Sequence, residues 1–73
     1  NDLMDRRSIR RQREEAALRL AIQVFEDESN ARAWLARPIP SLGAARPNDL
    51  LRTEAGYELV IATLNKIQYG IPA

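Results

Sequence analysis

The fold of this chain is decided by residues 53–73, which read TEAGYELVIATLNKIQYGIPA. Thr53 is a good N-cap, and Glu54 places an acid in the first turn of a helix, where it interacts favourably with the helix dipole. Apolar residues then recur at helical spacing: Tyr57, Val60, Ile61, Leu64 and Ile67. Gly70 predicts the end of this helix, and Ile71-Pro72-Ala73 cannot continue it. We therefore expect a C-terminal helix followed by a short tail.

A long first helix is predicted from Arg6 to about Glu26, and its two halves differ in character. The first half is rich in arginine and places two acids one turn after two of the arginines, in the pairs Arg10–Glu14 and Arg11–Glu15. Each such pair is worth roughly 0.2–0.5 kcal/mol and supports a solvated helix. The second half is apolar on nearly every side: Ala16, Ala17, Leu18, Leu20, Ala21, Ile22, Val24 and Phe25. Such a helix lies in the centre of a core, and in so short a chain we expect a second copy to supply part of its cover.

The middle of the chain predicts a short helix that contains the only tryptophan. Asp27 or Ser29 caps this helix, which runs to about Ala36. Three of its apolar residues share one face: Ala31, Trp34 and Leu35. This spacing favours a core role for Trp34 over a role in binding.

A loop rich in helix breakers is predicted after this helix. Residues 37–47 contain Pro38, Pro40, Gly43 and Pro47, which indicates an ordered, turn-rich connection. Pro47 suits the first position of a one-turn helix over residues 47–51, and the C-terminal helix follows. Because the chain carries no strand signal, we predict an all-α fold. It is a small bundle of about four helices with a Pro/Gly-rich connecting loop and a short non-helical C-terminal tail.

The composition limits how a chain of 73 residues can be stabilised. A domain of this size buries only about 60% of the surface that its unfolded chain exposes. Without cysteine or histidine it has no disulfide, and an ordinary zinc site is nearly excluded, so we expect self-association, as a homodimer, and no metal. The lack of cysteine fits a cytoplasmic protein. No 18-residue apolar run and no signal-peptide h-region occur, so we expect no membrane contact.

The residue types also bear on catalysis. Without histidine or cysteine, the common nucleophile and general-base arrangements cannot be built. Asp27 and Glu28 stand at a helix start, where acids are stabilising without any catalytic role. The segment Gly43-Ala44-Ala45 lacks the glycine spacing, the lysine and the hydroxyl residue of a phosphate loop. We therefore predict no catalytic residues, no cofactor and no enzyme activity.

The arginines of the first helix are candidate nucleic-acid contacts: Arg6, Arg7, Arg10, Arg11 and Arg13. The net charge of the chain is only +1, with six arginines against four acids in residues 1–25. No aromatic residue is interleaved with the arginines, and Glu14 and Glu15 offset their charge. The pattern favours a solvated helix over a nucleic-acid site.

The C-terminal tail is the strongest functional signal. The last five residues, Tyr69 to Ala73, are apolar and semi-rigid, whereas ordinary C-termini are polar and frayed. A short apolar peptide that ends in a carboxylate suits insertion into a cleft of another protein. The alternative is that Tyr69 and Ile71 fold back onto Trp34, and the residues alone leave both interpretations open.

A series of residues in fixed order resembles the toxin-binding domain of Xre, MbcA and ParS antitoxins. It runs from about Ala21 to the last residue and comprises Val24-Phe25, Ala31, Trp34-Leu35, Pro38, Leu42-Gly43, Pro47, Leu50-Leu51, Thr53-Glu54, Gly56, Val60, Leu64 and Ile67-Gln68-Tyr69-Gly70. The residues that identify the fold in this series are Phe25, Trp34, Leu35, Pro38, Leu42, Gly43, Pro47, Leu51 and Gly56. The resemblance divides the chain into a polar Arg-rich segment, residues 1–15, and a toxin-binding domain, residues 16–73.

The resemblance implies an antitoxin of a type II toxin–antitoxin system. Its partner would be a toxin of the RES family, NAD-consuming enzymes related to ADP-ribosyltransferases. In that family the C-terminal end of the antitoxin is placed at the entrance of the toxin active site. The toxin-binding residues would then be Lys66, Tyr69, Gly70, Ile71, Pro72 and Ala73. The antitoxin would act by occupying the site, without chemistry.

Three positions depart from the family pattern. Relatives usually have a second glycine after Gly43, where this chain has Ala44, so we expect that turn either to avoid a positive φ at Ala44 or to tolerate strain. A glycine is common where Glu26 stands. A serine or threonine cap is common where Arg46 precedes Pro47.

The region before the match leaves two further hypotheses open. Many relatives carry a helix-turn-helix DNA-binding domain there, and only about twenty residues precede the match here. DNA is therefore an expected partner only if such a region is missing from this chain. One alternative function is the dimerisation domain of a DNA-binding repressor, with the Arg-rich segment contacting nucleic acid. The other is a purely structural dimerisation module.

Overall fold

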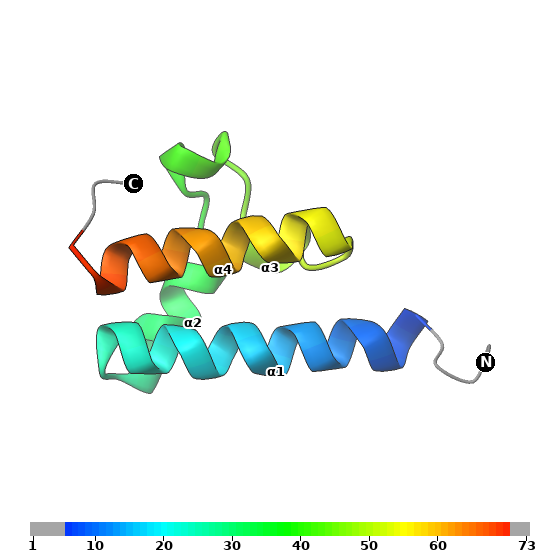
Figure 1. The fold of residues 1–73 in the computed structure, drawn as a ribbon, viewed down its shortest axis with the longest axis horizontal. Coiled ribbons are helices and arrows are strands. Elements are labelled where there is room, and N and C mark those ends of the chain that lie inside the picture. Colours follow the sequence, from blue (N-terminus) through cyan, green and yellow to red (C-terminus); the bar gives the residue numbers. More distant parts are fainter. Residues whose placement is uncertain (1–5, 71–73) are drawn as a thin grey trace.

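The computed structural model describes residues 6–70, which form four α-helices and one turn of 3-10 helix. These elements are α1 (Arg6–Phe25), α2 (Glu28–Ala36), η1 (Pro40–Leu42), α3 (Pro47–Leu50) and α4 (Glu54–Gln68). Helices α1 and α4 lie side by side and run in the same direction, while α2 lies behind them (Figure 1). The all-α prediction is confirmed, and the one β-type pairing among the described residues is an isolated bridge between Ile39 and Ala45.

Two helix starts carry the predicted side-chain caps. The Asp27 carboxylate accepts a hydrogen bond from the backbone N–H of Asn30 at 2.7 Å, which makes Asp27, and not Ser29, the N-cap of α2. The Thr53 hydroxyl accepts from the N–H of Gly56 at 3.0 Å at the start of α4. Each cap satisfies a donor that the helix leaves unpaired.

The third helix starts without a side-chain cap. Pro47 occupies its first turn, as predicted, but Arg46 stands at the N-cap position and forms no capping hydrogen bond. The departure from the family pattern at Arg46 therefore corresponds to a missing contact. Pro47 itself is buried, and its preset φ favours this single helical turn.

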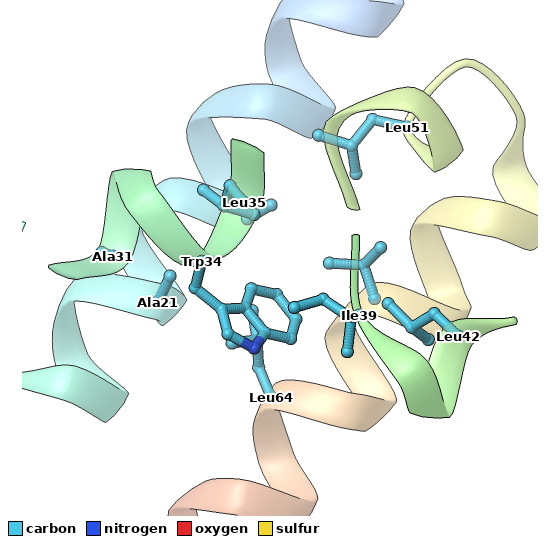
Figure 2. Packing of buried hydrophobic residues seen from close by; sticks show 10 residues of the cluster. Ala21, Ala31, Trp34, Leu35, Ile39, Leu42, Leu51 and Leu64 are labelled. Carbon is cyan, nitrogen blue, oxygen red and sulfur yellow. The ribbon is translucent and has the colours of Figure 1, made fainter. Parts of the chain in front are cut away.

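The core is centred on Trp34, as the sequence predicts. Its side chain is only 5% exposed, and Figure 2 shows its ring in the middle of the cluster, near Ile39 and Leu64. The Phe25 ring packs against it, with centroids 5.9 Å apart and a tilt of 44°. The other buried apolar residues are Ala17, Ala21, Ala31, Leu35, Leu42, Leu51 and Val60. Aromatic pairs of this kind add to the stabilisation that burial already supplies.

Helix α1 enters this core through small residues. Ala17 and Ala21 are completely buried, which lets α1 approach the neighbouring helices closely. Its larger apolar side chains are half-buried and pack around the cluster: Leu18, Leu20, Ile22, Val24 and Phe25. The expectation of cover on several sides is therefore met only in part by the elements of a single chain.

The connection between α2 and α3 is a turn-rich loop anchored by two buried side chains, Ile39 and Leu42. The N–H of Ile39 donates to the carbonyl of Ala45 at 3.0 Å, and the N–H of Ala44 donates to that of Ile39 at 3.0 Å. Gly43 and Ala44 both adopt a positive φ, of 68° and 64°. Of the two outcomes expected for Ala44, the turn thus takes the strained one.

Glu26 adopts the same backbone conformation at the end of α1. Its φ is 55°, and its N–H donates to the carbonyl of Ile22 at 2.7 Å, closing the helix. A residue in the left-handed region is the usual way to end a helix, and glycine is preferred there because it lacks a Cβ. Two of the three departures from the family pattern, Glu26 and Ala44, therefore fall on positions with a positive φ.

Gly56 is required by the packing of α3 on α4. A Cβ atom at this position would overlap the backbone carbonyl oxygen of Leu50. Because this obstacle is main chain, it has no rotamer by which to move away. The absence of a side chain at Gly56 allows the end of α3 to lie directly on the first turn of α4, and Leu51, the next residue after α3, is completely buried.

Candidate functional site

The end of α4 presents the predicted toxin-binding residues to solvent. Tyr69 is 73% exposed, and its N–H closes the helix by donating to the carbonyl of Asn65 at 3.1 Å. Gly70 follows with a φ of 72° and donates to the carbonyl of Ile67 at 3.1 Å. Gly70 thus ends the helix as predicted. With most of its ring in water, Tyr69 does not fold back onto Trp34.

Lys66 lies in the last turn of α4 and is exposed. A cation at this position interacts favourably with the negative end of the helix dipole. Lys66 forms no ion pair within residues 6–70, so its ammonium group is available to a partner. Ile71, Pro72 and Ala73, the remaining predicted toxin-binding residues, lie outside the described part of the chain.

The first turn of α4 is held in place by Arg13 of α1. Its guanidinium donates to the backbone carbonyls of Leu51 and Arg52, at 3.3 and 3.2 Å, and pairs with the Glu54 carboxylate at 3.3 Å. The Arg13 side chain is 17% exposed. One residue of α1 therefore satisfies carbonyls at the end of α3 and contacts the start of α4.

The five candidate nucleic-acid contacts do not form one patch. Arg13 is committed to the contacts above, and Arg10 pairs with Glu14 at 3.2 Å. Arg7 and Arg11 are exposed, and Arg11 forms no ion pair with Glu15 or with any other described residue. The side chain of Arg6 lies outside the described part. The sequence prediction of the Arg10–Glu14 pair is confirmed, whereas that of Arg11–Glu15 is wrong.

A hollow of about 520 Å³ lies between α1, α2 and α3. Its floor includes Leu18 and Leu35, and its rim carries Arg10, Glu14 and Arg32. Both arginines are engaged in ion pairs one turn along their own helices, Arg32 with Glu28 at 2.8 Å. The mixture of both charges on the rim does not select a ligand of either sign.

Residues 6–70 contain neither a metal-binding cluster nor a helix that could span a membrane. No group of three or more carboxylate, histidine or cysteine side chains gathers where it could hold a metal ion. None of the helices in this part of the chain has the length and apolar character that crossing a bilayer requires.

Sequence reasoning missed one exposed residue of α4, Leu59, which is 48% exposed. It is out of phase with the apolar residues that face the core, such as Val60 and Leu64, which are completely buried. The signal that identifies it is this phase difference: a leucine on the polar side of an otherwise amphipathic helix.

Aromatic residues are enriched in protein–protein interfaces, and Tyr69 presents one to solvent at the end of α4. Comparison with known protein families identifies the kind of interaction domain. The sequence model described as the antitoxin Xre/MbcA/ParS C-terminal toxin-binding domain matches residues 20–70, and the chain belongs to this family. The resemblance recognised from the motif residues is thereby confirmed.

A curated relative supports the same assignment. The protein named Antitoxin Xre from Photorhabdus laumondii subsp. laumondii is 36% identical to this chain over 52 residues. The match covers 70% of this chain and 35% of the relative. The chain thus spans about a third of the length of the relative it matches.

Proposed function

We propose that this chain is the inhibitory part of an antitoxin that binds a RES-family toxin and blocks its active site with the C-terminal end of α4 and the tail. The observation that carries the proposal is the exposure of Tyr69, 73%, at the end of a helix whose start is anchored. The family description, a toxin-binding domain, supplies the class of partner.

The proposed mechanism is occupancy. The apolar side chains of residues 69–73 enter the cleft and lose their contact with water, which favours binding through the hydrophobic effect. No bond is made or broken by the antitoxin, which in this proposal is not an enzyme and acts in the cytoplasm.

The proposal includes a homodimer. Its support is the second half of α1, where Leu20 and Val24 remain half-buried at the edge of a small core. A second copy that covers this face would add the apolar burial that a chain of this size lacks. Light scattering of the purified chain tests this part, and a molar mass equal to that of one chain at micromolar concentration contradicts it.

The experiment for the inhibitory role measures NAD consumption by the RES-like protein encoded beside this chain. The full chain and a chain that ends at Gln68 are titrated against it. A chain without residues 1–5, which precede α1, is the matched control for the removal of five terminal residues. We expect the full chain and the control to inhibit, and the chain that ends at Gln68 to lose most of the inhibition. Full inhibition by the chain that ends at Gln68 contradicts the role of the tail.

The second candidate function, contact with nucleic acid, is favoured by the exposure of Arg7 and Arg11 on the first turns of α1. In Figure 1 these turns extend beyond the start of α4. Phosphate contacts make DNA binding weaken steeply with salt. A gel shift by this chain alone that disappears as salt is raised supports this candidate, and the substitutions Arg7→Gln and Arg11→Gln then abolish the shift.

A further inference from the structure

The large apolar side chains that residues 6–70 expose most are Leu59 of α4 and Tyr69, the C-cap residue that follows this helix. Helical spacing places Leu59 on one side of the helix together with three further exposed residues, and Tyr69 continues this side at the end of the helix. We call the helical set the outer face of α4: Ala55, Leu59, Ala62 and Lys66. Its members follow one another at intervals of three or four residues along the whole helix.

A single exposed leucine is common on protein surfaces and by itself requires no explanation. The outer face differs because Leu59 has a small residue one turn before and one turn after it, Ala55 and Ala62. A helix with an apolar anchor between alanines allows close approach of a partner surface, as in helices that bind in grooves through anchors at i, i+4 and i+7.

The outer face is also rigid before any partner binds. Thr53 caps the first turn of α4, Gly56 lets α3 pack on it, and Arg13 ties it to α1. Little conformational entropy is therefore lost when a partner meets α4, which favours affinity.

We propose that the outer face of α4 is the surface that holds the toxin, distinct from the tail that inhibits it. This inference rests on the proposed function, because the occupant is the same RES-family toxin. The outer face is continuous with Tyr69, so one partner that receives the tail also lies along the helix. The complementary surface is an apolar groove that receives Leu59, with an acidic side chain opposite Lys66.

The test compares substitutions on the outer face with a matched substitution elsewhere. Leu59→Glu and Ala62→Glu place a charge on the outer face, and Ala33→Glu makes the same change at an exposed position of α2. All three positions are exposed, so circular dichroism and thermal unfolding are expected to stay close to those of the unchanged chain. We expect Leu59→Glu to raise the dissociation constant for the toxin by about a hundred-fold or more, and Ala62→Glu by about ten-fold. We expect Ala33→Glu to leave it unchanged.

The chain that ends at Gln68 completes the design. We expect it to keep binding of the toxin, weakened by the loss of Tyr69, while it fails to inhibit NAD consumption. For Leu59→Glu we expect the reverse. Binding of the toxin is weakened, so inhibition is lost at low concentration of this variant, but it is recovered at high concentration because the tail is intact.

Three outcomes overturn the inference, and each is distinguishable from the others. If Leu59→Glu binds the toxin as tightly as the unchanged chain, the outer face is not part of the interface, while the proposed function stands. If Leu59→Glu changes the molar mass of the free chain and not the affinity of each chain for toxin, the outer face binds a second copy. If the unchanged chain does not bind the toxin, the proposed function and the inference both fail.

Discussion

The first turn of α4 is held by the Thr53 cap, by the packing of α3 on Gly56 and by Arg13 from α1, whereas its last turn carries Tyr69 into solvent. The same helix therefore has a start committed to the fold and an end free for a partner. Substitutions at the start are expected to change the free energy of unfolding, and those at the end to change binding. The difference shows how a small domain without a large core can hold one end of a helix firmly and leave its other end exposed to solvent.

The largest effect on stability is expected from Gly56→Ala. The added methyl group overlaps the carbonyl of Leu50, so α3 and α4 must move apart, and the free energy of unfolding should fall by about 3 kcal/mol. Gly70→Ala makes the same change at the other end, where no atom lies within reach but φ is 72°, and should lower it by about 1 kcal/mol. Urea unfolding followed by Trp34 fluorescence measures both. Equal losses at the two glycines would contradict the distinction between the two ends.

The next effect is expected from Arg13→Met, which keeps an apolar stem and removes the guanidinium. The carbonyls of Leu51 and Arg52 lose a charged donor, and we expect a loss of about 2 kcal/mol. The pair with Glu54 adds little, because that carboxylate is 63% exposed. Arg11→Met, at an exposed position of the same helix, is the control and should change stability by less than about 0.5 kcal/mol. Similar losses of stability for both variants would show that the guanidinium of Arg13 contributes no more than that of an exposed arginine.

A smaller effect is expected from Thr53→Ala. The N–H of Gly56 loses its partner, and loss of such a cap lowers the free energy of unfolding by about 1 kcal/mol. Thr53→Ser retains the hydroxyl and should stay close to the unchanged protein. Thermal unfolding of the three proteins gives the result, and an equal loss in the serine variant would assign the effect to the methyl group instead of the hydrogen bond.

The smallest effect on stability is expected from Tyr69→Ala at the open end. Because Tyr69 is 73% exposed, the free energy of unfolding should change by less than about 0.5 kcal/mol, while toxin inhibition weakens. Tyr57→Ala reverses the pattern, since Tyr57 is half-buried against the core. Stability should fall there while the folded fraction still binds toxin. Unfolding curves and inhibition assays on both variants decide this, and a large stability loss in Tyr69→Ala would place its ring in the fold.

The start of α4 could be predicted from sequence because its signals are local. Thr53 and Gly56 are three residues apart, and a cap is defined within that distance. The Asp27 cap of α2 and the one-turn helix at Pro47 could be predicted for the same reason, because their signals are also local. The position of Trp34 followed from its spacing with Ala31 and Leu35, since helical periodicity decides which face is buried.

The Arg13 contact could not be predicted in this way. Its partners lie 38 to 41 residues further along the chain, and two of them are backbone carbonyls with no sequence signature. The arginines around it carry the same side chain, so composition alone assigned all five to one candidate patch. Arg13 differs from the other arginines because it lies on the side of α1 that meets the start of α4. Which side of α1 this is depends on tertiary packing.

The site at the open end was predictable in part. Lys66 and Tyr69 were identified from the resemblance and from the apolar tail, and the structure leaves both exposed. Leu59 was left out of the predicted apolar stripe and was given no role, because a single leucine outside such a stripe is common on protein surfaces and carries no signal of its own. Leu59 precedes Val60 by one position, which corresponds to a rotation of about 100° around the helix axis. Leu59 is therefore exposed to solvent, whereas Val60 faces the core.

The parallel arrangement of α1 and α4 has a consequence for the order of events during synthesis. Helix α1 leaves the ribosome first and can pack against α2 soon afterwards, but α4, the helix that lies along it, begins 29 positions after α1 ends (54 − 25). Until residues 54–68 emerge, the part of α1 that packs against α4 remains uncovered and open to aggregation or to chaperones. Packing of the core is completed only when α4, which carries Val60 and Leu64, has been made. A nascent chain interrupted before α4 is therefore incompletely folded and, under the proposed function, also lacks the end that would bind the toxin, so defective copies are exposed to proteolysis.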